Sequence, residues 1–325
     1  LATVALDDKY TLQQGRAFMT GTQALVRLPM LQRQRDQAVG LKTAGFISGY
    51  RGSPLGAYDQ ALWQARKFLA KGDIHFQPGV NEELGATAVW GSQQVNLWQG
   101  AKVDGVFGIW YGKGPGVDRS VDALKHANFA GTSRHGGVLA FAGDDHSCKS
   151  STLPHQSDQA FIHAFMPTIN PAGVQEFLDL GLIGFALSRY SGAWVGFTCI
   201  ADTIDTTAIV DIDPARIIIN EPTDFELPPG WLNIRLHDTP LIQEARMIDW
   251  KLDAARAFAR ANRLDKVVFG HAAPRLGLVT IGKSYLDVRQ ALDELEISEE
   301  MAREWGLGIY KVAMAWPLEP QGMRA

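Results

Sequence analysis

Short apolar runs alternate along this chain with segments of helical periodicity, and this alternation limits the folds that the chain can adopt. The runs that resemble buried strands are residues 44–48, 103–110, 137–142 and 194–200. Strands that alternate with helices in this way are joined by crossover connections, which make neighbouring strands parallel. The sequence therefore predicts an α/β protein with a mostly parallel sheet.

Helices are expected between these strands, at residues 22–40, 57–70, 81–99, 118–130 and 174–190. Thr22 and Asn81 are residue types whose side-chain oxygen caps a helix N-terminus, so we expect each to cap its helix. Pro29 interrupts the first helix, because proline lacks the N–H that an interior position donates. A glycine-rich turn is expected over residues 111–116.

The second half of the chain indicates a domain boundary. Residues 203–238 are Pro-rich and irregular, and residues 240–262 form a charged amphipathic pattern. After them come a strand-like run at 276–281, a helical pattern at 284–294 and a second strand-like run at 309–315. We therefore divide the chain into a first domain (1–230), a linker with an amphipathic helix (231–267) and the start of a second α/β domain (268–325).

Composition excludes several classes of protein. The 325 residues carry a net charge of −4, which gives no general attraction to nucleic acid or an anionic membrane. No apolar run reaches the roughly 18 residues of a membrane span, and the N-terminus lacks the order of a signal peptide. The two cysteines, Cys148 and Cys199, cannot build a metal cluster or a disulfide framework. We expect a cytoplasmic protein, without nucleic-acid or membrane partners, that is a piece of a longer chain.

Two segments form the candidate site. Tyr50-Arg-Gly-Ser-Pro-Leu-Gly56 follows the first predicted strand, and Val80-Asn-Glu-Glu-Leu-Gly-Ala86 opens a helix. Both are expected at the carboxyl edge of the sheet, where open α/β sheets bind their ligands. The segments would bring a carboxylate and free backbone amides to that edge.

Glu82 and Glu83 lie in the first turn of this helix. Acidic residues favour that position through the helix dipole alone, by about 0.3–1 kcal/mol. Successive helix residues point about 100° apart, so both carboxylates cannot face one ligand. A buried carboxylate needs a partner, and a catalytic carboxyl with a raised pKa would suit such a position. The sequence leaves open whether Glu82 is a helix-end charge or a functional group.

Lys113 is flanked by Gly112, Gly114 and Gly116. The pattern does not match the phosphate loop G-x-x-x-x-G-K-[ST], because no Ser or Thr follows the lysine, and it does not match G-x-G-x-x-G. It could be a tight crossover from strand to helix, or it could hold a cation over the sheet edge to meet an anion. Both interpretations stay open.

No metal site is predicted. Gly143-Asp-Asp145 with Asn170 departs from the Gly-Asp-Gly…Asn-Asn pattern that binds Mg²⁺ and diphosphate, because Asp145 and Pro171 replace a glycine and an asparagine. His146, His155 and His163 have no spacing typical of a metal site. We expect a solvated or substrate-covering loop over residues 143–158.

Several stretches together resemble a known family. They are Gly21-Thr-Gln-Ala-Leu25, Gly49-Tyr-Arg-Gly-Ser-Pro54, Asn81-Glu82, Trp110-Tyr-Gly-Lys-Gly-Pro-Gly-Val-Asp-Arg119, Gly143-Asp-Asp-His146 with Ser150-Ser151 and His155-Gln156, and Ser188-Arg-Tyr-Ser-Gly192. They resemble the N-terminal portion of the indolepyruvate ferredoxin oxidoreductases, in the long form with fused subunits. The wider group is the thiamine diphosphate-dependent 2-oxoacid:ferredoxin oxidoreductases.

The resemblance implies roles for particular residues. The first domain would be the pyrimidine-binding domain of a thiamine diphosphate fold, with Glu82 as the catalytic carboxyl that bonds the aminopyrimidine ring. Tyr50 and Gly52 would also contact the cofactor, and Ser53, Lys113 and Arg51 would contact the substrate. Ser53 takes the place of a threonine in the family's loop, and Arg51 replaces a proline.

The resemblance also implies partners. Residues 268–325 would begin a transketolase-C-terminal-like domain, and the domain that binds Mg²⁺ and diphosphate, like the 4Fe-4S cluster, would lie downstream or on another chain. The reaction would convert a 2-oxo acid of the aryl pyruvate type and coenzyme A to acyl-CoA, with electrons passed to ferredoxin in a homo-oligomer. This chain alone would be inactive.

Two alternatives remain. One is a non-oxidative thiamine diphosphate-dependent decarboxylase or a transketolase-like enzyme, and downstream iron–sulfur cysteines would argue against it. The other is a non-catalytic subunit that retains the fold, against which the presence of Glu82 and Lys113 argues.

Overall fold

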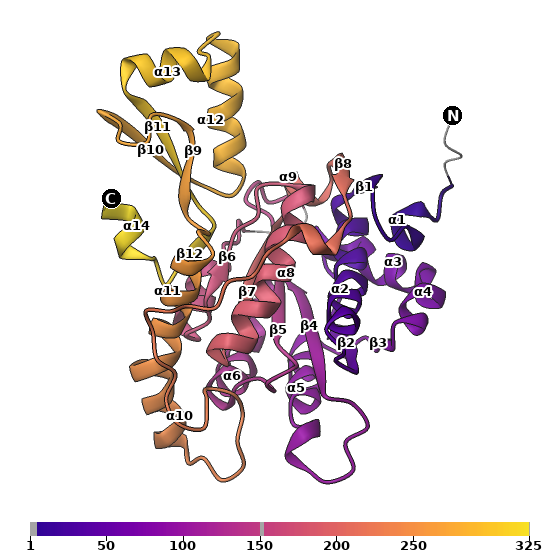
Figure 1. The fold of residues 1–325 in the computed structure, drawn as a ribbon. Coiled ribbons are helices and arrows are strands. Elements are labelled where there is room, and N and C mark those ends of the chain that lie inside the picture. The colour runs from indigo at the N-terminus through magenta and orange to yellow at the C-terminus, as the bar shows by residue number, and fades with distance from the viewer. Residues whose placement is uncertain (1–4, 150–152, 325) are drawn as a thin grey trace.

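A seven-stranded sheet forms the centre of the molecule in the computed structural model, which describes residues 5–149 and 153–324 (Figure 1). The strand order is β12-β6-β7-β5-β4-β2-β3. The four central strands are β2 (Thr43–Gly49), β4 (Gly105–Lys113), β5 (Val138–Asp144) and β7 (Val195–Ile200), and the outer ones are β3 (Ile74–Phe76), β6 (Thr168–Ile169) and β12 (Met314–Trp316). All pairings are parallel except that of β12 with β6. The predicted α/β class with a mostly parallel sheet is confirmed.

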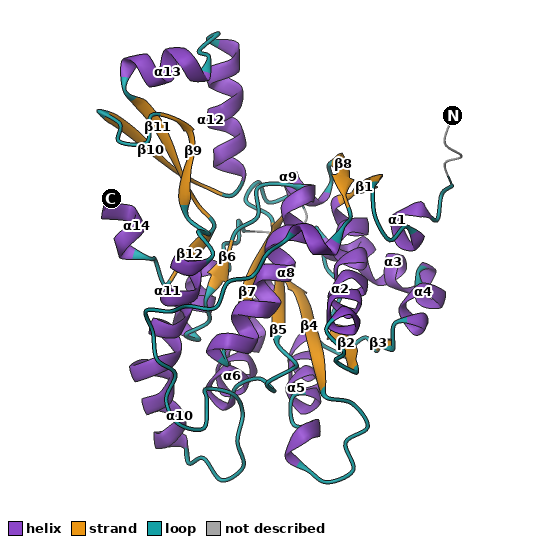
Figure 2. Cartoon of the chain, viewed as in Figure 1, coloured by secondary structure: helices purple, strands orange, loops and turns teal. Residues whose placement is uncertain are grey.

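Helices cover both faces of this sheet (Figure 2). On one face lie α2 (Gly21–Ala38) and α8 (Val174–Ser191). These two helices are so close that a Cβ on Gly181 would overlap the Leu28 side chain. On the other face lie α5 (Glu82–Ser92) and α6 (Gly114–Ala130). Each face has its own buried apolar cluster, and β4 is buried along its length except at Lys113. A sheet that is covered on both faces explains why its strands are continuous apolar runs.

Shorter elements connect and flank these layers. The short helices are α1 (Asp8–Thr11), α3 (Tyr58–Gln64), α4 (Arg66–Lys71), α7 (Asp158–His163), α9 (Ala201–Ile204) and α14 (Pro320–Arg324), with 3-10 turns at Leu55–Ala57, Val95–Leu97 and Pro214–Arg216. An antiparallel pair joins β1 (Arg16–Thr20) to β8 (Thr207–Asp211). In the described residues no helix is long and apolar enough to cross a membrane.

A smaller unit follows near the C-terminus (Figure 1). Its three-stranded sheet has the order β10-β11-β9, with β9 at Lys266–Gly270, β10 at Leu276–Ile281 and β11 at Leu307–Val312. The helices α12 (Lys283–Glu294) and α13 (Glu299–Trp305) pack on it around a separate apolar cluster. The chain then returns at once to the main sheet through β12, so this unit is tied to the larger one at both ends.

Several helices begin or end at residues other than those predicted. Thr20 caps α2 in place of Thr22, because its side chain accepts from the Gln23 N–H and the Gln23 side chain accepts from the Thr20 N–H, both at 3.1 Å. Asn81 caps α5 as predicted, accepting from the Leu84 N–H at 2.8 Å. The helix predicted over 57–70 divides near Ala65, and that predicted over 81–99 ends at Ser92.

The predicted glycine-rich turn at residues 111–116 is wrong. Strand β4 continues to Lys113, and α6 begins at Gly114 with Pro115 in its first turn. Proline suits that position because its missing N–H has no intrahelical acceptor there. The irregular stretch predicted over 203–238 also contains a strand, β8. Ser150 and Ser151 lie outside the described residues.

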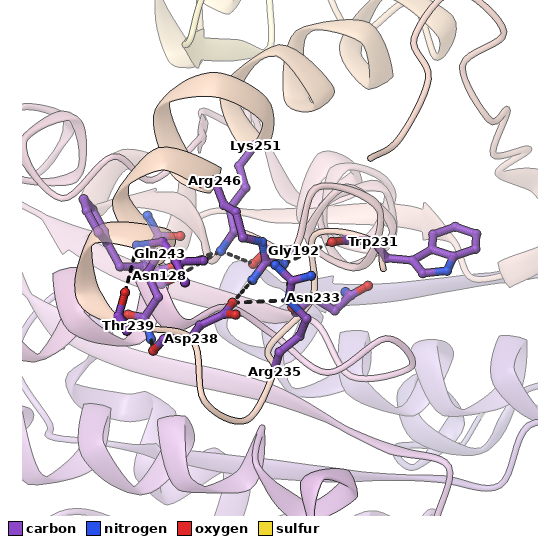
Figure 3. A network of polar contacts seen from close by, with 12 residues as sticks. Asn128, Gly192, Trp231, Asn233, Arg235, Asp238, Thr239, Gln243, Arg246 and Lys251 are labelled. Atoms are coloured by element: carbon purple, nitrogen blue, oxygen red, sulfur yellow. Dashed lines mark hydrogen bonds and ion pairs between the residues drawn. The ribbon is translucent and has the colours of Figure 1, made fainter. Parts of the chain in front are cut away.

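The amphipathic helix predicted over 240–262 is interrupted. It consists of α10 (Pro240–Arg246), a π-helical turn (Met247–Lys251) and α11 (Leu252–Ala261). The π-turn brings Lys251 into the protein, where its side chain is fully buried. Its Nζ donates to the carbonyl oxygens of Asn128 (3.0 Å), Phe129 (3.2 Å) and Gly192 (3.1 Å), as Figure 3 shows in part. These carbonyls lie at the C-terminal ends of α6 and α8, which carry unsatisfied acceptors and partial negative charge.

Replacement of Lys251 by methionine should destabilise the fold. The carbonyls of Asn128 and Phe129 would lose a buried donor, and an unsatisfied buried acceptor costs about 1–3 kcal/mol. We expect Lys251→Met to lower the free energy of unfolding by about 2–4 kcal/mol in urea titrations. The control Lys42→Met removes an exposed lysine and should change it by less than about 0.5 kcal/mol. Equal effects of the two variants would contradict this role for Lys251.

Candidate active site

The carboxyl ends of β2 and β4 lie side by side and carry the two segments that the sequence singled out. Tyr50 follows β2 directly, and its N–H donates to the Tyr111 carbonyl of β4 at 3.0 Å. Gly79, which precedes α5, donates to the Gly49 carbonyl at the end of β2 at 2.8 Å. The loop after β2 and the start of α5 are therefore both held at the same sheet edge.

Helix α5 approaches β2 more closely than side chains would allow. A Cβ on Gly85 would lie 2.8 Å from the Cα of Gly49, a distance that only two glycines tolerate. The Trp110 indole Nε1–H, fully buried in β4, donates to the Glu82 carbonyl at 2.9 Å. These two contacts fix the first turn of α5 against the sheet.

Glu82 and Glu83 have different environments. Glu82 is 8% exposed, whereas Glu83 is exposed. The Glu82 side chain lies against the first turn of α6, where a Cβ on Gly116 would be 2.6 Å from Glu82 Cγ and 2.8 Å from Oε1. Among the described residues the Glu82 carboxylate has no hydrogen-bond or ion-pair partner. A buried carboxylate without a partner in its own chain is costly, and it is available to a ligand.

Lys113 crosses the loop that follows β2. A Cβ on Gly52 would lie 2.6 Å from Lys113 Cδ and 2.7 Å from its Cγ, so the lysine stem occupies the space that the glycine leaves free. Lys113 has no ion-pair partner in the part of the chain that the structure describes. Its half-buried position at the end of β4 leaves an unneutralised cation at the sheet edge.

Arg51 adds a second cation from the same loop. It is exposed, and its charge acts on Asp59 and on the Tyr111 hydroxyl. Burial raises the pKa of Asp59, while the neighbouring Tyr111 and Arg51 oppose the increase. Burial also raises the pKa of Tyr111, and Asp59 adds to that increase. The sequence analysis did not relate Asp59 to Tyr111, because no motif connects a residue in α3 with one at the end of β4.

The remaining predicted residues lie on the same loop. Tyr50 is 37% exposed, and Ser53 is exposed beside it. Pro54 and Leu55 lie near the end of β5, where a Cβ on Gly143 would be 3.2 Å from Pro54 Cδ and 3.1 Å from Leu55 Cγ. The loop thus extends across the ends of three neighbouring strands.

A short strap over residues 153–157 lies beside this site. The fully buried Asp144 accepts from the Ser157 N–H (2.9 Å) and from its hydroxyl (2.6 Å). A Cβ on Gly114 would lie 2.3 Å from the Cβ of His155, so His155 packs directly on this glycine. The His155 Nε2 is 3.4 Å from an Asp118 oxygen. Both oxygens of Asp144 are therefore engaged within the protein. No group of three or more His, Cys, Asp or Glu that could hold a metal ion occurs in residues 5–149 and 153–324.

Comparisons with known proteins agree with the resemblance seen in the motifs. Residues 266–325 match a family model described as the indolepyruvate oxidoreductase domain. The chain is 22% identical over 321 residues to the indolepyruvate oxidoreductase subunit IorA of Methanothermobacter thermautotrophicus, which covers 98% of this chain and 46% of that protein.

This chain is related to the indolepyruvate oxidoreductases. The match to a solved 2-oxoglutarate:ferredoxin oxidoreductase from Magnetococcus marinus has a TM-score of 0.65 at 16% identity, and it covers 93% of this chain and 54% of that one. That structure contains 2-oxoglutarate, coenzyme A and succinyl-CoA, and its likeness to this chain is one of fold. The chain spans about half the length of both relatives.

The Asp144 contact predicts a pH dependence of stability. Burial raises the pKa of Asp144 to about 6, from an ordinary value of 3.8, although its bonds to Ser157 oppose the increase. The folded state then binds the proton more tightly than the unfolded state, so stability falls as pH rises from about 4 to above 6. We expect the free energy of unfolding of the wild type to fall relative to that of Asp144→Asn over this window, by at most roughly 3 kcal/mol. Parallel pH profiles for the two proteins would refute the assignment.

Proposed function

We propose that this chain contributes the pyrimidine-binding part of a thiamine diphosphate-dependent 2-oxoacid:ferredoxin oxidoreductase that acts on an aryl pyruvate. The observation that carries the proposal is Glu82, a buried carboxylate without a partner in the described chain, at the carboxyl edge of the sheet. Two cations from neighbouring segments, Lys113 and Arg51, lie at the same edge. A carboxylate for the cofactor ring and cations for an oxo acid are the groups that such a reaction requires.

The residues present fit the pyrimidine end of the cofactor. Glu82 would accept a hydrogen bond from a ring nitrogen, which supplies the missing partner of this carboxylate. Gly112 and Gly116 leave space beside it, since a Cβ on Gly116 would fall within 3 Å of the carboxylate. Tyr50 and Gly52 lie on the adjacent loop, where they would contact the cofactor. When bound, thiamine diphosphate supplies the carbanion chemistry that cleaves the bond next to a 2-oxo group.

The protein itself would orient the substrate and the cofactor and would neutralise the charge of the substrate carboxylate. Lys113 would hold the substrate carboxylate, because its stem is fixed across Gly52 and its amine has no internal counter-ion. Arg51 would add a second positive charge, and this charge acts on the nearby Asp59, where it opposes the rise in pKa that burial causes. Ser53 would contact the oxo acid from the tip of the loop. Glu82 would stabilise the protonated ring nitrogen, so that the cofactor is held in its reactive tautomer.

Further domains complete the proposal. Residues 268–325 would begin the transketolase-C-terminal-like domain, and the groups that bind Mg²⁺ and diphosphate, like the 4Fe-4S cluster, would come from outside this chain. Coenzyme A would accept the acyl group, ferredoxin would accept the electrons, and the assembly would be a cytoplasmic homo-oligomer. The relatives' names support the reaction class, and the similarity to the indolepyruvate enzymes supports an aryl pyruvate as the proposed substrate.

Glu82→Gln tests the cofactor contact. In the complete enzyme this variant should leave the fold intact and slow the exchange of the C2 proton of bound thiamine diphosphate by about 10²–10⁴-fold, as loss of acid–base catalysis does. NMR of quenched samples measures the exchange. The matched control is Glu83→Gln, which alters an exposed carboxylate one position along and should have little effect. Mild effects of similar size for both variants would show that Glu82 is only a helix-end charge.

Lys113→Met tests the substrate contact. The variant keeps the stem that packs over Gly52 and removes the charge, so we expect KM for the oxo acid to rise by about tenfold or more with a smaller change in kcat. Steady-state kinetics on the complete enzyme, with aryl pyruvates as substrates, give both constants. An unchanged KM together with a lower melting temperature would mean that the lysine is structural.

A further inference from the structure

A cavity of about 280 Å³ lies at the amino edge of the main sheet, away from the candidate active site. Arg134 and His135 line it just before β5 begins, and Tyr190 lines it near the end of α8, which leads into β7. Most of its wall is apolar: Ala186, Tyr190, Ile219, Leu227, Trp231 and Phe258. Binding pockets commonly combine such walls with a few polar groups, so the polar residues decide what this one could hold.

Trp231 is presented to this cavity by a constrained backbone. Its φ angle is 61°, in a region that bulky residues rarely occupy. Buried Arg246 holds this conformation, because its Nη2 donates to the Trp231 carbonyl at 3.1 Å and to the Asn233 carbonyl at 2.8 Å. Figure 3 shows the indole directed away from this network, and the residue is 47% exposed. Strained residues of this kind are frequent at ligand-binding positions.

Arg134 stands over the indole as an available cation. Its Cζ lies 4.1 Å from the centre of the Trp231 ring, and it has no carboxylate partner among the described residues. Arg189, in contrast, is neutralised by Asp36 at 2.7 and 2.9 Å. A guanidinium that stacks through its face keeps its N–H donors in its plane, where they can bind a carboxylate in bidentate fashion.

Charged groups of both signs lie around the cavity, and Arg134 is a cation of its wall that has no carboxylate partner among the described residues. Burial lowers the pKa of His135, Arg189 and Arg134 lower it further, and the carboxylates of Asp104 and Asp36 oppose this decrease. Glu221 is the acidic residue among those that line the cavity, and it is exposed. A ligand that places its charge on Arg134 would therefore have its apolar body between Trp231, Tyr190 and Phe258.

We propose that this cavity binds a small carboxylate with a flat apolar body, held by the Arg134 guanidinium and the Trp231 indole. The site is separate from the candidate active site and does not depend on the proposed reaction.

Calorimetry of the intact protein with phenylacetate, and with the neutral phenylacetamide as a control ligand, tests the proposal. We expect saturable binding of phenylacetate and an affinity about tenfold or more weaker for phenylacetamide, equivalent to about 1.4 kcal/mol or more. Arg134→Gln should weaken phenylacetate binding by a similar factor, and Trp231→Asn should do so while tolerating the positive φ. The control Arg256→Gln alters an arginine that pairs with Asp253 and does not line the cavity, so it should leave binding unchanged.

Two results would overturn the proposal. One is the absence of saturable binding with a Kd below about 10 mM. The other is binding that survives both Arg134→Gln and Trp231→Asn. Loss of such surviving binding in Lys113→Met would locate the carboxylate at the candidate active site. The phenylacetamide comparison requires no variant, so the charge dependence stays testable if a variant fails to fold.

Discussion

The contact between Gly85 of α5 and Gly49 of β2 is the constraint on which the candidate site depends. A Cβ at Gly85 would fall 2.8 Å from the Gly49 backbone, so any larger residue would push the helix away from the sheet. The Trp110 indole donates a hydrogen bond to the Glu82 carbonyl and so attaches the first turn of α5 to β4. Because of these contacts, Glu82 is buried while its neighbour Glu83 faces solvent. The first turn of α5 is thus positioned before any ligand binds.

The same principle recurs around the site, where glycines leave space for functional side chains. Gly116 leaves room for the Glu82 carboxylate, Gly52 for the Lys113 stem and Gly114 for His155. In each case the side chain comes from a different segment, so the glycine sets the distance between two segments that are remote in sequence. The result is a sheet edge that carries a carboxylate and cations, and among the described residues these groups form no ion pair with one another. Such unpaired groups are costly in a folded chain and are typical of sites that bind charged ligands.

The segment after residue 230 packs against the first domain, and it also links that domain to the next. Lys251 binds the C-terminal ends of α6 and α8, and Arg246 holds the backbone near Trp231 (Figure 3). Lys251 takes the place of water as the partner of helix-end carbonyls. Arg246 donates instead to the loop carbonyls of Trp231 and Asn233, and its charge is paired with Asp238. Strand β12 then returns the chain to the main sheet. The smaller unit is therefore attached at both ends.

The sequence by itself determined the α/β class, the central strands, the Asn81 cap and the segments of the candidate site, because these follow from local periodicity and residue chemistry. It also separated Glu82 from Glu83 in principle, since adjacent helix residues cannot face the same way. It missed the Thr20 cap, although the Thr20–Gln23 capping box is a local pattern. It could not place the extension of β4 to Lys113 or the π-turn at Lys251, because these depend on packing between distant segments. The Asp59–Tyr111 pair and the Arg134–Trp231 cavity have no sequence signature at all. Only the tertiary structure brought them together, because their members are separated by tens of residues and meet only when the sheet is assembled.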